Sequence, residues 1–292
     1  MLQYKEYYMP KSIDELMQVI KENDSAEIIS GGTDLYAEER EPLDDNKIAV
    51  DISKIKEFSI IESNNETITF GASTTVQQFI EEAVLVQDVP IMRHAASYFA
   101  DQQIREMATV GGNIANSSPT GDMIPPLLAM GAKIHTIKCI DDDICEDMTL
   151  IEDFIKGVGK NTLSYGEVIL SVTCPNVSDY GCAFKKVGLR RSLCISTVSS
   201  AFLVKVDKTK NVFEDVRIAF GGISPIPVRL REVEKRLIGS SVTYQVVQEM
   251  LKHIPEDIVQ SRSRREYRKT IVRNFLLAGL LEALAEIDIV FE

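Results

Sequence analysis

The chain has few of the residues from which proteins build metal sites and disulfides. It contains three histidines, and no two of them are spaced to share one turn of a helix, as a metal-binding pair requires. Its five cysteines are odd in number and show no C-x-x-C spacing. These shortages argue against a disulfide framework and against a zinc or iron–sulfur site in this chain. The residues are His94, His135, His253, Cys139, Cys145, Cys174, Cys182 and Cys194.

Three familiar motifs are also missing. No G-x-G-x-x-G opens a helix, and no G-x-x-x-x-G-K-[ST] occurs, so a Rossmann or P-loop nucleotide site is excluded. The G-x-S-x-G elbow of serine hydrolases is absent as well, which disfavours hydrolysis. A nucleotide bound by this chain must therefore be held in another way.

Long apolar runs and an excess of positive charge are lacking too. The first eight residues contain no apolar signal core, and the longest late apolar run, 275–281, is far below the ~20 residues that span a bilayer. The net charge of −12 opposes nonspecific binding to nucleic acid. We therefore expect a cytoplasmic protein with no nucleic-acid or membrane partner. Its 292 residues, 45% hydrophobic, are enough for two packed domains.

What the chain does contain is two glycine pairs, one at Gly31-Gly32 and one at Gly111-Gly112. Glycine lets backbone amides approach an anion closely, because no Cβ blocks the approach and a positive φ costs little. Short neutral donors flank both pairs and suit phosphate and ribose oxygens without the cost of burying a cation. These donors are Thr33, Thr109, Asn113 and Ser118.

Each glycine pair alone is typical of a tight turn after a strand. Both pairs, however, follow short β-branched or apolar runs, and both have a hydroxyl or amide neighbour. The second pair also leads into Ser118-Pro-Thr-Gly-Asp122. Together the two pairs predict a diphosphate cradle for a dinucleotide.

At these residues the chain resembles the FAD-binding medium subunit of the molybdenum hydroxylases, a family that includes xanthine, carbon monoxide and nicotinate dehydrogenases. Ser30–Leu35 is similar to the first flavin segment of that family, and the longer stretch 108–122 is similar to the second. Three later stretches, 184–191, 220–229 and 263–268, are similar to segments of its C-terminal part. The resemblance covers nearly the whole chain.

The resemblance implies an α+β fold in two domains. Residues 1–175 would form an FAD-binding domain of two α/β subdomains, of the vanillyl-alcohol-oxidase and cell-wall-reductase type, with FAD between them. Residues 176–292 would form a C-terminal α+β domain with helices against an antiparallel sheet. Residue patterns alone predict strands over 27–30, 47–52, 67–70, 183–187, 195–206 and 216–220. They predict helices starting at Ser12 and over 76–84, 90–99, 244–253 and 267–285.

The resemblance also implies which residues bind FAD. The first segment would wrap the pyrophosphate through Ile28, Ile29, Ser30, Gly31, Gly32, Thr33, Asp34 and Leu35. The second segment would bind its other side through Thr109, Val110, Gly111, Gly112 and Asn113.

Four further residues are implied at the two ends of the cofactor. Asp122 would hold a ribose or nearby hydroxyl, and Phe99 would place its ring against the adenine. Main chain at Ile169 would meet that same end. Lys186 falls on a flavin-side lysine, where a cation would stabilise the anionic reduced flavin. No catalytic acid or base and no metal ligand is expected in this chain.

In that family FAD passes electrons to NAD(P)+ or another acceptor, while a molybdenum cofactor and [2Fe-2S] clusters lie in partner subunits. The substrate of the assembled enzyme would be a purine or N-heterocycle such as xanthine or nicotinate. Two alternatives stay open: a self-contained FAD oxidoreductase, which needs its own substrate pocket, and a non-catalytic assembly subunit. The intact glycines argue against the second alternative.

Two features fit the family less directly. Cys194 stands where relatives often have an aspartate, which leaves the role of that aspartate in doubt here. Arginine is concentrated around residues 262–273, on a predicted helix. This basic stretch is either a solvated helix face, the commoner case, or a contact for a partner subunit or for the phosphates of a nicotinamide cofactor.

Overall fold

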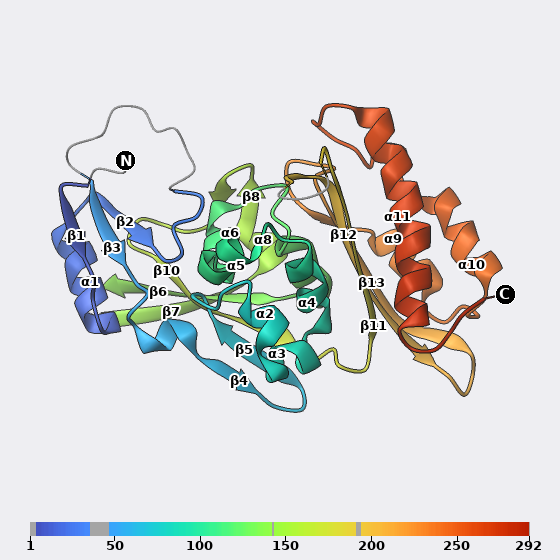
Figure 1. Cartoon of the computed structure of the whole chain (residues 1–292), viewed down its shortest axis with the longest axis horizontal. Helices are drawn as coiled ribbons and strands as arrows, with labels where there is room; N and C mark the ends of the chain where they lie inside the picture. The colour runs from blue at the N-terminus through green and yellow to red at the C-terminus, as the bar shows by residue number, and fades with distance from the viewer. Residues whose placement is uncertain (1–3, 36–46, 142, 191–193, 292) are drawn as a thin grey trace.

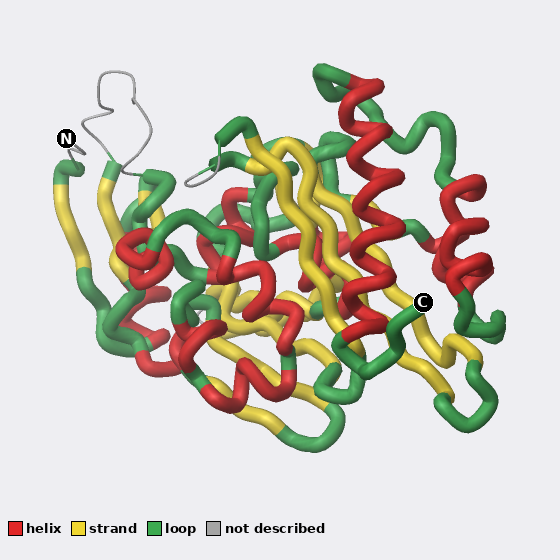
Figure 2. The backbone as a smooth tube through the Cα atoms, turned by 45° about the vertical axis from the view of Figure 1, so that its right-hand side comes forward, coloured by secondary structure: helices red, strands yellow, loops and turns green. Residues whose placement is uncertain are grey.

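A computed structural model describes residues 4–35, 47–141, 143–190 and 194–291 of the protein. Three sheets follow one another along the long axis of the molecule, with most helices lying between the second and third sheets or beyond the third (Figure 1). Figure 2 shows that the strands of the third sheet run alongside the long C-terminal helix. The predicted α+β class is confirmed by this mixture of helices and largely antiparallel sheets.

The first sheet is small and parallel. Its strand order is β1-β3-β2, and helix α1 connects β1 to β2. The hydroxyl of Ser12 accepts a hydrogen bond from the Glu15 amide and caps α1, which confirms the predicted helix start. The Glu15 carboxylate accepts from the Lys11 amide, one residue before the position of a standard capping box. The bounds are β1 Glu6–Tyr8, α1 Ile13–Glu22, β2 Ala26–Ile29 and β3 Ile48–Asp51.

The second sheet has five antiparallel strands in the order β4-β5-β10-β6-β7. Its strands are β4 Ile61–Ser63, β5 Thr67–Gly71, β6 Lys133–Ile140, β7 Asp143–Leu150 and β10 Val168–Pro175. Smaller elements accompany it: the 3-10 helix η1 Lys56–Ser59, helix α8 Ile151–Phe154, and the hairpin of β8 Ile155–Gly157 and β9 Lys160–Asn161.

Six short helices connect β5 to β6. The predicted helix over 76–84 is wrong in extent, because Glu82 adopts an extended conformation and separates two helices. The predicted helix over 90–99 is confirmed, with Pro90 in its first turn, where a missing amide costs nothing. The six are α2 Gln78–Glu81, α3 Ala83–Asp88, α4 Pro90–Ser97, α5 Gln102–Met107, α6 Val110–Asn116 and α7 Ile124–Met130.

The third sheet is an antiparallel meander in the order β11-β12-β13-β14. Helix α11 packs across β11 and β12. Gly279 permits this close packing, because a Cβ at that position would lie 2.1 Å from the Phe202 ring. The strands are β11 Gly181–Gly188, β12 Ser196–Asp207, β13 Val212–Gly221 and β14 Val228–Arg229. The helices are α9 Arg231–Leu237, α10 Tyr244–Glu249, the 3-10 helix η2 Met250–His253, and α11 Arg265–Ala285.

Both faces of the third sheet are buried. One face, with Cys182 and Phe184, joins the core of the first two sheets, while the other face, with Phe202, packs under α9 and α11. Helices α4 and α7 cover the first of these faces. The third sheet therefore meets the rest of the chain through a continuous apolar core. Among the described residues, no helix has the length and apolar character needed to cross a bilayer.

Candidate functional site

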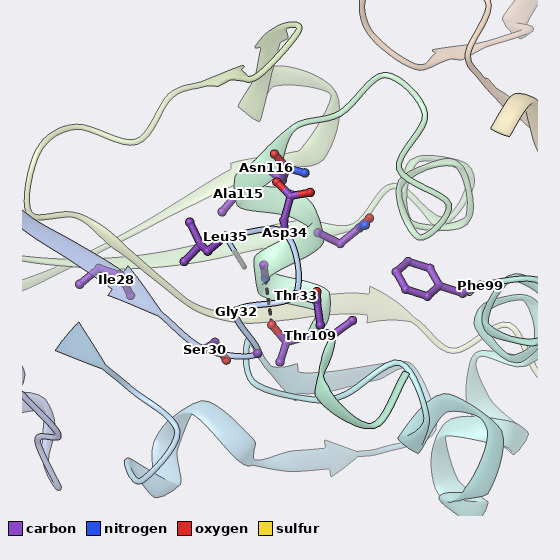
Figure 3. A pocket seen from close by; sticks show the side chains of 14 residues that line it. Ile28, Ser30, Gly32, Thr33, Asp34, Leu35, Phe99, Thr109, Ala115 and Asn116 are labelled. Carbon is purple, nitrogen blue, oxygen red and sulfur yellow. Dashed lines mark hydrogen bonds between the residues drawn. The ribbon is translucent and has the colours of Figure 1, made fainter. Parts of the chain in front are cut away.

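A cavity of about 330 Å³ lies where the loop after β2 faces helix α6. Figure 3 shows that the loop crosses in front of the first turn of α6, with Phe99 reaching in from the opposite side. Both glycine segments therefore line one cavity. The lining residues are Ile28, Ser30, Gly31, Gly32, Thr33, Asp34, Leu35, Phe99, Ala108, Thr109, Gly112, Asn113, Ala115 and Asn116.

The first glycine segment presents unused backbone donors. Within the described part of the chain, none of the hydrogen bonds made by backbone amides has Gly31, Gly32, Thr33 or Asp34 as its donor. Gly32 has a φ of +67°, a conformation that favours glycine and lets the chain turn at this point. Ser30 anchors the start of the loop, because its hydroxyl lies 3.1 Å from that of Ser73. The loop is thus fixed at its start while its next four amides stay available to a ligand.

Gly31 has a second role, which is to let the two segments touch. A Cβ at this position would lie 1.8 Å from the carbonyl oxygen of Met107, the last residue of α5. No side chain fits at that distance, and backbone cannot move aside cheaply. Gly31 therefore sets the width of the cavity by bringing the first loop against the chain that leads into α6.

The second glycine segment is a helix with paired amides, although its sequence suggests a loop. The amides of Val110 and Gly111 donate to the carbonyls of Thr74 and Ala72, at 3.0 and 2.8 Å. The next two donate to Thr109, Gly112 to its hydroxyl at 3.1 Å and Asn113 to its carbonyl at 3.0 Å. All four amides at the start of α6 already have protein acceptors, which caps the helix.

The second segment faces the cavity with side chains. Asn113 lines the cavity, and its Oδ1, an acceptor, is buried without a hydrogen-bond partner, so only a donor such as a hydroxyl or N–H group would complete it. Gly112 is exposed to the cavity, and a Cβ there would come within 3.0 Å of the Thr109 hydroxyl. Asn116 lies one turn further along the same helix face and, like Asp34, lines the cavity (Figure 3).

The electrostatics of the cavity are those of a neutral donor site. No lysine, arginine or histidine is among the described residues that line it, and Asp34, the charged residue of the lining, is exposed. Four free backbone amides and a hydroxyl suit an anion that is recognised by hydrogen bonds. The cradle therefore fits the pyrophosphate of a dinucleotide such as FAD.

Lys186 and Asp122 lie outside this cavity and bind each other. Their side chains are 3% and 9% exposed, and Lys186 Nζ lies 2.5 Å from an Asp122 carboxylate oxygen. Ser196 donates to the other oxygen at 2.5 Å, and the lysine also donates to the Tyr98 carbonyl at 3.1 Å. Burial raises the pKa of Asp122, while Lys186 opposes that rise. The group joins the turn after α6 to strands β11 and β12.

Tyr98 connects this ion pair with the cavity. Its carbonyl holds Lys186, while the next residue, Phe99, lines the cavity. Arg105 fixes the position of Phe99 by donating to its carbonyl at 3.1 Å. The ion pair is thus one residue removed from the cradle, and what Asp122 can offer a ribose is limited by its two protein partners.

The structure therefore separates the predicted residues into two groups. Those that line the cavity are Ile28, Ser30, Gly31, Gly32, Thr33, Asp34, Leu35, Phe99, Thr109, Gly112 and Asn113. Those that do not are Ile29, Val110, Gly111, Asp122, Ile169 and Lys186.

Most residues outside the lining support the cradle from behind. Ile29 ends β2 and Val110 starts α6, and both side chains are buried. A Cβ at Gly111 would lie 2.6 Å from that of Ala72, so this glycine serves helix packing. The Ala72 amide in turn donates to the carbonyl of Leu170, the neighbour of buried Ile169 on β10.

Sequence reasoning missed Ala108, Ala115 and Asn116. The last two lie three and four positions after Gly112, which is the spacing of one helix face. Treating the segment as a loop concealed that periodicity. No sequence pattern points to Arg105, because its role depends on hydrogen bonds to Gln77 and Phe99 that only the tertiary fold creates.

The cysteines near β11 and on the β6–β7 hairpin do not form a metal site in the described part of the chain. Cys194 lies partly buried against β11, where a Cβ on Gly188 would meet its sulfur at 2.5 Å. Cys139 and Cys145 lie on the β6–β7 hairpin as free thiols. Among the residues described, no group of three or more histidine, cysteine, aspartate or glutamate side chains is arranged to hold a metal.

Comparison with known proteins identifies the family. Residues 2–177 match the FAD binding domain in molybdopterin dehydrogenase, and residues 183–283 match the CO dehydrogenase flavoprotein C-terminal domain. The chain is 26% identical to the glyceraldehyde dehydrogenase medium chain of Sulfolobus acidocaldarius over 94% of this chain and 97% of the relative. It is 26% identical to the xanthine dehydrogenase FAD-binding subunit of Escherichia coli O157:H7 over 98% of each.

A solved structure shows the same fold. A chain of the Cu,Mo-CO dehydrogenase matches with a TM-score of 0.86 and 23% identity, over 98% of this chain and 99% of that one. This protein therefore belongs to the family of FAD-binding domains found in molybdopterin dehydrogenases. Its predicted cofactor, FAD, and its predicted class, an oxidoreductase subunit, are confirmed by that membership.

Proposed function

We propose that this chain is the FAD-carrying electron-transfer subunit of a molybdenum hydroxylase complex in the cytoplasm. Electrons released at a molybdenum cofactor in one partner would pass through [2Fe-2S] clusters in another and leave through FAD to NAD(P)+ or another acceptor. The cradle carries this proposal: residues 31–34, whose amides donate no hydrogen bond within the described part of the chain, line one cavity together with Thr109 and Asn113. FAD, when bound, supplies the redox chemistry, because it can take up and release electrons singly or in pairs.

The residues of this chain hold and orient that cofactor. The first loop would bind the pyrophosphate through its free amides, and the Thr109 hydroxyl and the Asn113 side-chain NH₂ group would donate to it from α6. Phe99 offers a flat apolar face at the side of the cavity, which suits a stacked ring system (Figure 3). The Lys186–Asp122 pair would fix the third sheet beside this site and keep a buried cation near the flavin end. Ile169 and Leu170 on β10 would support α6 from behind.

The substrate of the assembled enzyme is read by a partner subunit. We propose a purine or N-heterocycle such as xanthine or nicotinate. The xanthine dehydrogenase subunit supports this class, while the glyceraldehyde dehydrogenase chain shows that an equally similar relative serves an aldehyde. Since the same fold serves both, residues of this chain do not choose the substrate.

The test is the flavin content of the chain purified with its native partners. We expect an absorbance band near ~450 nm and release of FAD on denaturation. Asn113→Asp keeps the side-chain shape but places a negative charge against the pyrophosphate, so FAD affinity should fall at least about tenfold. Asn176→Asp is the matched control, since Asn176 is half-buried just after β10, does not line the cavity, and has an Oδ1 that accepts from the Ser178 amide.

Two results would refute the proposal. One is a wild-type chain that is colourless and cannot be reconstituted with FAD, which would leave an assembly role. The other is an Asn113→Asp chain that binds FAD as tightly as Asn176→Asp does.

A further inference from the structure

A cluster of arginines lies at the start of α11, in a chain whose net charge is −12. We call it the arginine cluster and define it as Arg262, Arg264, Arg265 and Arg268. Arg264 and Arg265 are exposed, Arg262 is half-buried and Arg268 is buried. Four positive side chains within seven residues repel one another, so their concentration needs a physical reason.

Arg268 provides the structural part of that reason. Its Nε donates to the Ser263 carbonyl at 2.8 Å, and its Nη1 donates to the carbonyls of Gly222, at 2.7 Å, and Thr197. These bonds tie the start of α11 to the ends of β12 and β13. Burial lowers the pKa of Arg268, and the neighbouring charges of Arg262 and Arg264 lower it further. Arg268 is thus an anchor, and the other arginines lie within electrostatic reach of it.

The remaining three arginines are not neutralised. Across the described ranges, no carboxylate lies within ion-pair distance of Arg262, Arg264 or Arg265. Glu266, the acid inside the segment, pairs with Lys269 at 3.5 Å. In addition, the Nε of Arg262 is buried and has no hydrogen-bond partner. A buried donor without an acceptor is costly, and an anion that reached it would remove that cost.

The size and chemistry of the cluster favour a small phosphorylated ligand. Guanidinium groups match phosphate oxygens with paired hydrogen bonds. An acidic protein partner would need a broad positive face, of the order of 800 Å². Here the positive stretch is short, because exposed Glu256 and Asp257 precede it in the sequence and exposed Glu266 lies inside it.

The cluster also lies on the same edge of the third sheet as the buried ion pair. Thr197, whose carbonyl Arg268 holds, directly follows Ser196, whose hydroxyl binds Asp122 and so reaches Lys186. Gly222, the other carbonyl partner, receives support from the cradle side, because its amide donates to the Pro119 carbonyl just after α6. A ligand held by the arginines would therefore lie at the edge of the sheet that also carries the Lys186–Asp122 pair.

We propose that Arg262, Arg264 and Arg265 bind the phosphate groups of the soluble electron acceptor, a phosphorylated small molecule of the dinucleotide type. The assignment as acceptor rests on the proposed function, whereas the anion site itself does not. The site is separate from the FAD cradle, since none of these arginines lines that cavity.

The test measures binding of inorganic pyrophosphate to the FAD-loaded complex by titration calorimetry. Loading with FAD first prevents the probe from entering the cradle. Arg264→Gln/Arg265→Gln should weaken pyrophosphate binding at least about tenfold and raise the KM for the nucleotide acceptor, with unchanged FAD content. Lys208→Gln/Arg236→Gln is the control, because it removes the same charge from exposed positions on β12–β13 and α9.

Several results would overturn the proposal. Wild-type complex that binds no pyrophosphate at millimolar concentration excludes an anion site. Equal weakening in both double variants shows an effect of net charge only. Loss of a partner subunit from Arg264→Gln/Arg265→Gln, with protection of 261–268 from hydrogen exchange in the complex, assigns the cluster to a subunit interface. Absence of FAD from the wild-type complex would instead refute the proposed function and leave the pyrophosphate result to stand alone.

Discussion

The two glycine segments share a dipeptide but use it differently. In the first, Gly31 and Gly32 belong to a loop whose amides are free to meet a ligand. In the second, Gly111 and Gly112 lie in the first turn of α6, where every amide already has a protein acceptor. One segment supplies backbone donors, and the other supplies a packed wall with side chains. A glycine pair in a sequence therefore indicates that something approaches the backbone closely. The fold decides whether that is a ligand or another part of the chain.

The largest expected effect is a loss of stability on breaking the Lys186–Asp122 pair, which holds the turn that follows α6. Lys186→Met would leave the charge of Asp122 buried without its cation, held by the Ser196 hydroxyl, so the free energy of unfolding should fall by about 3–5 kcal/mol. Lys186→Met/Asp122→Asn should recover most of that loss, because the buried charge is gone. Urea denaturation measures both. A loss below about 1 kcal/mol in the single variant would show that the pair does not support the wall.

The next effect concerns the contact between the segments. Gly31→Ala would place a methyl group against the Met107 carbonyl, and we expect a loss of about 3 kcal/mol in stability together with loss of FAD. Gly131→Ala serves as the control. It places a methyl group in open space, and its positive φ of 68° costs only about 1 kcal/mol. Equal melting temperatures for the two variants would contradict the close contact at Gly31.

A matched pair of smaller changes tests the difference between the free amides of the first segment and the paired amides of the second. Gly32→Ala strains a residue with φ of +67° and disturbs the free amides, so FAD affinity should fall about tenfold. Gly112→Ala adds the same methyl group inside α6, where alanine is favoured by about 0.5–1 kcal/mol. Its FAD affinity should fall no more than about threefold. Fluorescence titration with FAD compares the two variants. If Gly112→Ala lowered FAD affinity more than Gly32→Ala, the first segment would not be the one that supplies backbone donors.

The smallest expected effect is at the helix cap. Thr109→Val removes the hydroxyl that accepts from the Gly112 amide and should cost about 1 kcal/mol in stability. Thr109→Ser should retain the bond and most of the stability. If Thr109→Val instead lowered FAD affinity more than Gly32→Ala did, the second segment would be a donor site after all.

Most of the large elements were predictable from the sequence because their patterns are local. The strands at 47–52 and 195–206 and the long helix α11 carry continuous apolar or periodic signals, and the structure confirms them. Helix α6 was not predictable in this way, since Gly111 and Gly112 have low helix propensity. Its stability comes from the Thr109 cap and from bonds to Ala72 and Thr74, contacts that local sequence does not display.

The candidate site shows the same division. The glycine motifs locate both walls of the cavity, because close backbone approach leaves a signature in residue type. They do not reveal that Gly111 serves packing, that Asp122 is occupied by Lys186 and Ser196, or that Asn116 faces the cavity. Each of these depends on where distant elements meet, and hence on the tertiary fold.

The contact between Gly31 and Met107 has a consequence for the order of events during synthesis. The first loop leaves the ribosome well before the residue that sets its distance from α6. At roughly 5–20 residues per second, Met107 follows Gly31 by about 4–15 s. Over that interval the nascent chain carries the donors of the cradle without its opposing wall, so cofactor capture must wait until the helices between β5 and β6 have been made.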